Sequence, residues 1–472
     1  MEHRTKRDLA LMNLVHDFEA RFESGDIEYL GEKTYLQLIE YYDGENQWDK
    51  ALDVVDLALE QYRYRSDFYI LKARLLLNSG KLDQTIEALN DAEVVAPGEF
   101  EVLILKARAL SLLTRHSDAL EILSSIKSRV MSSDLSELLI CESYIYETMK
   151  DYEMMYEVLK KSLNINPNND EALERMLLCT ELSRKYEESI TFLENLLNQE
   201  PYSYMAWYNL GHAYNYLGEY EKAINAIEYS FLINDQFENG YIDCAELCFQ
   251  EKLYERSYNI FEEANVMFGP ESDYLVNMAR CQFQLGNIKL SKHLLSKSIK
   301  YDPYNDDAYF TLGECYASED NWYSAINAFH KAVSLDERCE EYYFGLAKAY
   351  VKVENYTKAT INFNKATKSG PEQSNYWSEY AMFLLKLGLH NEALCILDEA
   401  EDYTFGADLL YCRAITMMFL KERKAGLSIL EEALAEDISQ HTLLFDMSPE
   451  LEVDKEITSM IRYFTSELGE TK

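Results

Sequence analysis

The sequence has little of the two residues that most often interrupt helices. Only 7 of its 472 residues are proline and 17 are glycine, whereas 47% are hydrophobic. A disordered chain would need more proline and glycine, together with fewer apolar residues. The composition therefore argues against disorder and favours a helical protein.

Basic residues are also scarce. Lysine and arginine number 45 against 83 aspartates and glutamates, which gives a formal net charge of −38. Binding to a phosphate backbone needs an excess of positive charge, so we expect no nucleic-acid partner. The negative field instead suits a basic protein partner.

No run of about 18 apolar residues occurs, and the first residues lack the apolar core and cleavage site of a signal peptide. The number of cysteines is odd and their spacing follows a repeat, so no disulfide framework is implied. These absences predict a cytoplasmic protein that does not insert into a membrane. The nine cysteines are Cys141, Cys179, Cys244, Cys248, Cys281, Cys315, Cys339, Cys395 and Cys412.

Motifs for catalysis are missing as well. The sequence has no HExxH zinc motif, no GxxxxGK[ST] phosphate loop, no GxGxxG dinucleotide fingerprint and no GxSxG nucleophile elbow. Its many carboxylates are spread over predicted helix faces, so no acid–base pair stands out. We therefore predict that the chain is not an enzyme and needs no cofactor.

What is present is a pattern, clearest in residues 204–235. The pattern has the spacing W-x2-L-G-x2-Y followed by an alanine. Small residues allow two antiparallel helices to approach closely, the apolar ones form a helical stripe, and a glycine between the helices permits a positive φ angle. The stretch predicts a helical hairpin. Its pattern residues are Trp207, Leu210, Gly211, Tyr214, Gly218 and Ala223.

The same pattern recurs along nearly the whole chain in steps of 34 residues. One step is two residues longer, which we assign to a turn around residues 128–134, and the last repeat starts one residue early. Five of the seven prolines fall at one repeat position, where proline ends the second helix. The twelve repeats start at Glu32, Ser66, Phe100, Ser136, Asp170, Tyr204, Glu238, Ser272, Asp306, Glu340, Ser374 and Ala407.

With these motifs, residues 32–440 resemble the tetratricopeptide repeat proteins. The resemblance implies an all-α fold, a right-handed α-solenoid built from twelve helical hairpins. The first helix of each pair would line a concave groove and the second would form the convex face. The family usually binds other proteins, often an extended peptide or a helix held in the groove.

The two ends depart from the repeat. Residues 1–31 contain a predicted helix from about 5 to 23 that stops at Gly25, and we expect it to cap the first repeat. Residues 441–472 contain a predicted helix start at Ser448–Pro449 and should cap the last repeat. The apolar faces are Leu11, Val15, Phe18 and Phe22 at the first end and Ile457, Met460, Ile461, Phe464 and Leu468 at the second.

Inward-facing positions of the first helices change character along the chain. In the early repeats they are mixed and charged: Lys33, Glu40, Asp67, Arg74, Glu101, Arg108, Glu171, Glu174 and Glu181. From the sixth to the tenth repeat they are apolar or aromatic: Tyr208, Ile242, Phe249, Val276, Phe283, Phe310, Phe344 and Val351. Arg280, Lys348, Glu246 and Glu314 lie among them, and His212 is the one histidine expected to face the groove.

An apolar stripe of this extent is typical of a binding surface. We expect a partner segment in the groove of repeats six to ten, anchored by Phe249, Phe283, Phe310 and Phe344, with Arg280 meeting an acidic group. The alternative is that these side chains pack between adjacent first helices.

Cys244 and Cys248 have a spacing that suits metal ligands, but their repeat positions are core positions, so no metal site is expected. The sequence thus predicts a non-catalytic scaffold or adaptor. The alternative is a peptide-sensing regulatory protein that controls a separate enzyme or transcription factor.

Overall fold

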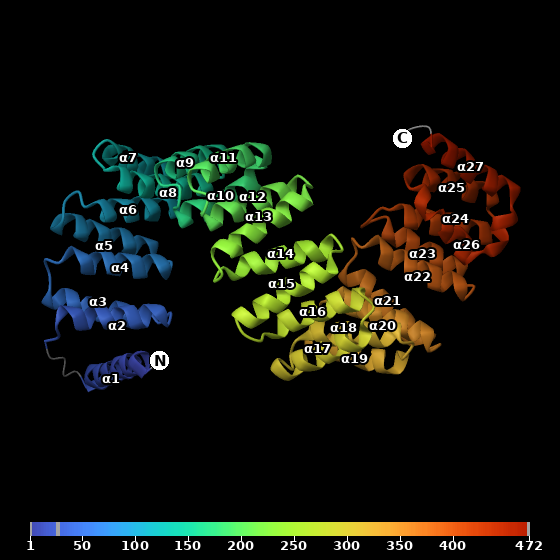
Figure 1. The fold of residues 1–472 in the computed structure, drawn as a ribbon, viewed down its shortest axis with the longest axis horizontal. Helices are drawn as coiled ribbons and strands as arrows, with labels where there is room; N and C mark the ends of the chain where they lie inside the picture. Colours follow the sequence, from blue (N-terminus) through green and yellow to red (C-terminus); the bar gives the residue numbers. More distant parts are fainter. Residues whose placement is uncertain (1, 25–28, 470–472) are drawn as a thin grey trace. The chain divides into compact units, whose positions relative to one another are not determined.

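Helices account for all the regular structure in the described part of the chain (Figure 1). The computed structural model describes the backbone of residues 2–24 and 29–469, and the side chains of residues 11–22, 29–131 and 134–466. No strand occurs within these ranges. The predicted all-α fold class is confirmed.

Helical hairpins follow one another along the sequence, because α2 to α25 form twelve successive pairs. Helix α1 (Glu2–Ser24) precedes them. The pairs are α2 (Glu32–Gly44) and α3 (Trp48–Gln61), α4 (Ser66–Asn78) and α5 (Leu82–Val95), α6 (Phe100–Leu112) and α7 (His116–Lys127), α8 (Ser132–Thr148) and α9 (Tyr152–Ile165), α10 (Asp170–Ser183) and α11 (Tyr186–Gln199), α12 (Tyr204–Tyr216) and α13 (Tyr220–Ile233), α14 (Glu238–Gln250) and α15 (Tyr254–Met267), α16 (Ser272–Gln284) and α17 (Ile288–Tyr301), α18 (Asp306–Ser318) and α19 (Trp322–Leu335), α20 (Glu340–Lys352) and α21 (Tyr356–Ser369), α22 (Ser374–Lys386) and α23 (His390–Ala400), and α24 (Ala407–Phe419) and α25 (Arg423–Glu436).

A short irregular segment follows the last hairpin. It consists of the 3₁₀ helix η1 (Ile438–His441), α26 (Thr442–Met447), the 3₁₀ helix η2 (Pro449–Val453) and α27 (Lys455–Gly469). The expected helix start at Pro449 therefore gives a 3₁₀ turn, and the long helix begins at Lys455. None of the described helices is both long and apolar enough to cross a membrane.

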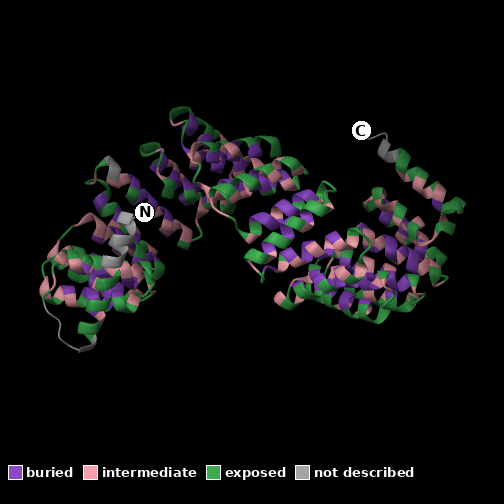
Figure 2. Cartoon of the chain, turned by 60° about the horizontal axis from the view of Figure 1, so that its bottom comes forward, coloured by how far each residue is buried: buried purple, intermediate pink, exposed green. Residues whose placement is uncertain are grey.

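The chain divides into two compact units, which are described separately below. Unit 1 comprises residues 1–240 and unit 2 comprises residues 241–472. In Figure 2, buried positions recur along the helices of each unit and alternate with exposed ones. This alternation is expected when each helix packs one face against its neighbours and leaves another in water.

Eleven of the twelve first helices begin at the residue that the 34-residue spacing predicts. The fourth does not: α8 begins at Ser132, four residues before Ser136, so residues 132–134 extend a helix rather than a turn. A physical reason is that Asp134 lies in the first turn of α8, where a carboxylate is stabilised by the helix dipole. Helix α1 also starts earlier than expected, and the predicted stop at Gly25 lies outside the described residues.

Close contact between the helices of one hairpin explains the small residues of the pattern. A Cβ atom on Gly211 would lie 2.4 Å from Cγ1 of Ile227 and 3.0 Å from the Ala223 carbonyl oxygen. Ala223 itself is fully buried. A larger side chain at Gly211 would therefore force α12 and α13 apart.

The turn inside each hairpin also repeats one conformation. Gly218 has a φ of +75°, as the sequence pattern predicts. Most hairpins, however, place another residue type at this turn position. The residues with positive φ at the hairpin turns are Asn46, Gly80, Thr114, Lys150, Arg184, Gly218, Lys252, Gly286, Asp320, Glu354, Gly388 and Lys421.

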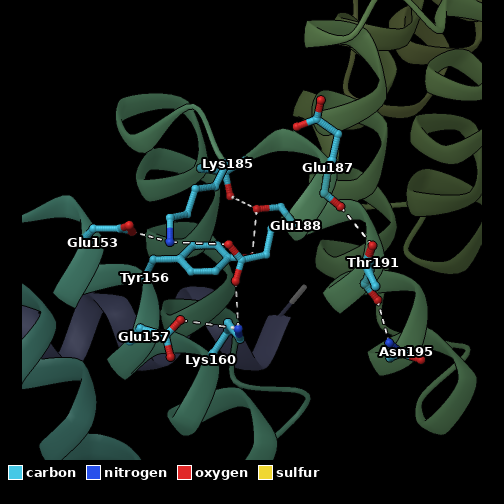
Figure 3. A network of polar contacts seen from close by, with 11 residues as sticks. Glu153, Tyr156, Glu157, Lys160, Lys185, Glu187, Glu188, Thr191 and Asn195 are labelled. Carbon is cyan, nitrogen blue, oxygen red and sulfur yellow. Dashed lines mark hydrogen bonds and ion pairs between the residues drawn. The ribbon is translucent and has the colours of Figure 1, made fainter.

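Polar contacts connect second helices of successive repeats, as Figure 3 shows for α9 and α11 in unit 1. Lys160 Nζ lies 3.1 Å from the Glu188 carboxylate, and Lys185 pairs with both Glu188 and Glu153. Both ammonium groups also lie over the Tyr156 ring, at 5.3 Å and 4.9 Å from its centroid. The network connects the fourth hairpin with the fifth through their second helices, α9 and α11.

Each end of the repeat array packs against a terminal helix. In unit 1, Val15 and Phe18 of α1 join the core of the first hairpins, whereas Phe22 is 40% exposed. The Glu19 carboxylate accepts hydrogen bonds from Lys50 Nζ at 2.7 Å and from the Tyr42 hydroxyl at 3.2 Å.

In unit 2, α27 packs against the last hairpin. Ile457 is fully buried in one core with Leu430, and Met460, Ile461 and Phe464 are partly buried beside them. Arg423 of α25 binds the carboxylates of Asp454 at 2.7 Å and Glu456 at 3.0 Å. The C-terminal segment therefore covers apolar residues of α25.

Candidate protein-binding surface

The residues expected to bind a partner are divided between the two units. Tyr208 and His212 lie on α12 in unit 1, and the others lie in unit 2. The unit 2 residues come from the four successive first helices α14, α16, α18 and α20. Each group is considered within its own unit.

In unit 1, Tyr208 is buried rather than presented to solvent. Its ring packs edge-on against Phe237 at 4.9 Å and against the His212 ring at 4.4 Å between centroids. His212 is partly buried. Tyr208 and His212 thus pack on each other, and Tyr208 also packs on Phe237.

In unit 2, Val276 and Phe310 are also buried, so each has little surface accessible to a partner. Phe310 is 9% exposed, and its ring lies 5.5 Å from that of Phe329 and 5.0 Å from that of Tyr342. The neighbouring helix leaves room for it, because a Cβ atom on Gly345 would lie 3.2 Å from the Phe310 ring.

Of the apolar side chains in unit 2 that were predicted to bind a partner, five are partly exposed. Phe344 packs against Tyr376 at 4.5 Å between ring centroids, and Phe249 packs edge-on against Tyr254 at 5.3 Å. Each ring thus has a supported side and some accessible surface. We name this set the aromatic surface, and its members are Ile242 and Phe249 of α14, Phe283 of α16, and Phe344 and Val351 of α20.

Charged residues of alternating sign accompany the aromatic surface. The ninth residue of each repeat is Glu246, then Arg280, then Glu314, then Lys348 along successive first helices. The Arg280 guanidinium lies over the Phe249 ring at 5.7 Å, and Lys348 Nζ lies over the Phe344 ring at 5.0 Å. We name these four residues the charge column.

Burial and like charges change the acidity of the carboxyl groups in this region. Burial raises the pKa of Glu314 to about 7; the nearby Glu341 carboxylate also raises it, while Arg280 and Lys348 lower it. Burial likewise raises the pKa of Glu246 and that of Glu341, and Arg280 opposes both shifts. Arg280 thus already acts on three carboxyl groups of its own chain, which compete with the acidic partner group expected for it.

Unit 1 contains a hollow that the sequence pattern did not single out. It has a volume of about 260 Å³ and is formed by α4, α6, α8 and α10. Its lining includes three glutamates at the second position of successive repeats, and that repetition is the signal that could have revealed it. The lining residues are Arg74, Leu77, Asn78, Glu101, Ile104, Leu105, Arg108, Glu137, Ile140, Cys141, Tyr144 and Glu171.

Cys244 and Cys248 are both completely buried, in keeping with the core positions that the repeat assigns to them. Among the described residues, no group of three or more histidine, cysteine, aspartate or glutamate side chains is placed to hold a metal ion.

Two protein-family models match parts of the chain. The family model for the tetratricopeptide repeat matches residues 142–169 and 206–235, and the model for anaphase-promoting complex, cyclosome, subunit 3 matches residues 290–366. No curated protein sequence matches the chain significantly.

Several solved structures resemble it at low identity. The yeast Tom70 structure has a TM-score of 0.43 and 14% identity, and the similarity covers 88% of this chain and 99% of that chain. The APC/C hetero-tetramer Cut9-Hcn1 has a TM-score of 0.39 and 15% identity, covering 86% of this chain and 97% of that chain.

Two independent lines identify the family. The helical hairpins follow the 34-residue signature along the chain, and the tetratricopeptide model matches two separate segments of it. The chain is therefore a tetratricopeptide repeat protein.

Proposed function

We propose that the protein is a non-catalytic scaffold that binds a segment of another protein on the aromatic surface of unit 2. The observation that carries this proposal is the row of partly exposed apolar side chains on α14, α16 and α20. Packing of the hairpins accounts for Val276 and Phe310, which are buried, but it leaves accessible surface on Phe249, Phe283 and Phe344.

A partner segment would gain free energy by removing that surface from water. Aromatic side chains that become fully desolvated commonly contribute about 2 kcal/mol or more each to binding, whereas exposed charges at the rim contribute little. An extended peptide or a helix would span several first helices, in the way that the family usually binds its partners.

The partner that fits best is a basic protein segment. Near the aromatic surface, Glu246, Glu314 and Glu341 outnumber Arg280 and Lys348, and the formal net charge of the whole chain is −38. The same charge disfavours a nucleic-acid partner. The family-model match to a subunit of a multiprotein complex covers α18 and α20 and is in keeping with a role in protein assembly.

We further propose a division of the chain that follows from this function. Residues 32–440 would form the binding scaffold, and residues 1–31 and 441–472 would protect its two ends from exposure of apolar repeat faces. The packing of Phe18 at one end and Ile457 at the other supports this division.

The test combines Phe249→Ala with Phe283→Ala, because both side chains are partly exposed and their loss leaves the buried Phe310 in place. A partner captured by affinity purification and identified by mass spectrometry is purified, and its dissociation constant is measured with each variant. We expect the double variant to bind at least about tenfold more weakly.

The matched control is Tyr323→Ala on the second helix α19, where the tyrosine is 76% exposed. It removes an aromatic ring without touching the aromatic surface, so we expect unchanged affinity. If Tyr323→Ala weakens binding and the double variant does not, the partner binds elsewhere.

A further inference from the structure

Three successive second helices of unit 2 differ in charge from the rest of the chain. Helices α17, α19 and α21 contain eight lysines and no aspartate or glutamate, whereas every other second helix contains at least one acidic residue. The whole chain has a formal net charge of −38. The three helices therefore present positive charge on a strongly acidic molecule.

Most of these lysines lie on the solvent-exposed faces of their helices. Residues 18, 22, 26 and 29 of a repeat fall on one face of the second helix, and all of them are exposed in the eighth, ninth and tenth repeats. The twenty-sixth residue is lysine in all three. We name the six lysines at these positions the basic face: Lys289, Lys297 and Lys300 of α17, Lys331 of α19, and Lys365 and Lys368 of α21.

The basic face ends at the neighbouring repeats of unit 2. The twenty-sixth residue is Glu263 on α15, before the basic face, and Glu399 on α23, after it. Both glutamates are exposed. A partner that pairs with lysines at this repeat position would therefore meet repulsion beyond three repeats on either side.

No carboxylate of the chain neutralises the basic face. Among the residues that the structure describes, none of its six lysines forms an ion pair. Two carboxylates in the adjoining turns pair elsewhere, Glu319 with Lys292 at 2.5 Å and Asp336 with Arg338 at 3.6 Å. In unit 1, by contrast, Lys160 of α9 pairs with a glutamate of α11 (Figure 3).

Two lysines of the basic face are held over tyrosine rings. Lys331 Nζ lies 5.8 Å from the centroid of the Tyr309 ring, and Lys365 Nζ lies 4.8 Å from that of Tyr343. The two tyrosines occupy the same position of successive repeats, so the arrangement recurs. A cation attracted to an aromatic ring has less freedom to lose when it pairs with a partner.

The composition of these faces favours protein carboxylates over phosphate groups. Helices α17, α19 and α21 contain no arginine, the residue that binds phosphate through two parallel hydrogen bonds. Tyr323 and Ile361 lie on the same exposed faces, with 76% and 52% of their surface accessible, and offer apolar contact. A nucleic acid or a membrane would extend past the basic face and meet the negative field of the remaining chain.

We propose that the basic face binds an acidic segment of a partner protein. Carboxylates of this segment pair with the lysines of α17, α19 and α21, and its apolar side chains contact Tyr323 and Ile361. The basic face lies on second helices and the aromatic surface on first helices, so this inference does not rest on the proposed function. The scaffold would then hold two partners of opposite charge.

The test measures fluorescence anisotropy with the full chain and two labelled peptides. One peptide repeats Glu-Glu-Leu, and its matched neutral control repeats Gln-Gln-Leu. We expect saturable binding of the acidic peptide and none of the neutral one. Combining Lys297→Gln, Lys331→Gln and Lys365→Gln should raise the dissociation constant of the acidic peptide roughly tenfold, because three exposed charge pairs are lost.

A matched variant removes three exposed lysines elsewhere: Lys33→Gln, Lys161→Gln and Lys424→Gln. It lowers the net charge equally, and Lys161 occupies the twenty-sixth position of the fourth repeat, in unit 1. We expect it to keep the affinity of the unaltered chain. The combination of Phe249→Ala and Phe283→Ala should also keep it, so failure of the aromatic surface can be told from failure of the basic face.

Three outcomes would overturn the proposal. The first is equal weakening in the two lysine variants, which would attribute binding to net charge alone, and the second is equal binding of the neutral peptide. The third is tighter binding of single-stranded DNA or of phosphatidylserine vesicles that is lost in the basic-face variant. Circular dichroism melts of both lysine variants should match that of the unaltered chain, since every substituted side chain is exposed.

Discussion

In most of the hairpins, the residue at the turn between the two helices has an unfavourable backbone conformation. The turn residue adopts a positive φ in each hairpin of the described chain, and in eight of them, Thr114 and Arg184 among others, it is not glycine. A left-handed conformation costs a residue with a Cβ atom roughly 1–2 kcal/mol. The cost is highest for a β-branched residue, because its side chain crowds the backbone.

Thr114, with a φ of +62°, is thus the turn residue at which glycine should help most. We expect Thr114→Gly to raise the free energy of unfolding by about 1 kcal/mol, since the relief of strain exceeds the added entropy of the unfolded chain. The midpoint of chemical denaturation measures the effect. Gly218→Ala, at the same turn position, should act in the opposite direction, and a lower midpoint for Thr114→Gly would show that Thr114 is not strained at this turn.

Glu314 makes the stability of unit 2 depend on pH. Its pKa of about 7 in the folded chain lies above the ordinary value of 4.5. A raised pKa means that the protonated form is favoured by folding, so stability is full below about pH 4.5 and is lost as the pH rises through 7. Glu314→Gln should therefore leave stability unchanged at pH 4.5 and increase it at pH 8, by an amount on the order of 2 kcal/mol.

Thermal unfolding at both pH values checks this prediction. Glu187→Gln serves as the control, because Glu187 is exposed on another helix and its loss should have no such effect. The prediction fails if Glu314→Gln shifts the melting temperature equally at pH 4.5 and pH 8.

For the helices and hairpins, the sequence predicts most of what the structure shows. Small residues, hairpin-turn glycines and prolines fall at fixed repeat positions, and each has a local physical cause, so they place the helix starts correctly. The extension of α8 to Ser132 was missed because no repeat position marks a helix that begins early. The 3₁₀ turn before α27 likewise has no counterpart in the pattern.

The candidate site was less predictable, because the exposed fraction of a side chain on a first helix depends on the residues of the neighbouring helix. Phe310 and Phe344 occupy the same repeat position, yet Phe310 is buried where Gly345 opposes it. Phe344 stays partly exposed. The hollow of unit 1 was missed for another reason: charged residues on the first helices suggest a solvated face until the structure shows that Glu101, Glu137 and Glu171 line one space.

Helix α27 provides a test of how the C-terminal segment supports the last hairpin. Ile457 is fully buried, so Ile457→Asp places an unpaired charge in the core and should cost on the order of 2–5 kcal/mol. We expect faster hydrogen exchange in α25, where Leu430 would become accessible. Tyr463→Asp on the same helix is the control, because Tyr463 is 57% exposed. Equal exchange in the two variants would show that α27 is dispensable.

The charge of the whole molecule should govern how fast a partner arrives. With a formal net charge of −38, the protein attracts a basic partner over distances that salt screens, about 10 Å at 0.1 M ionic strength. Raising sodium chloride from 50 to 500 mM should reduce the association rate constant by about tenfold and leave the dissociation rate constant nearly unchanged. Stopped-flow fluorescence with a labelled partner measures both, and a salt-independent association rate would contradict the prediction.

The charge column of unit 2 has a consequence for alignment. Glu246, Arg280, Glu314 and Lys348 alternate in sign from one repeat to the next. A segment that carries alternating charges at the same interval and lies along these helices would match all four in one register. If the segment were displaced by one repeat, its charges would face charges of the same sign in the column. If it were displaced by two repeats, its charges would again face charges of the opposite sign. Such a column would determine not only which segment binds but also at which repeat along the face the segment is held.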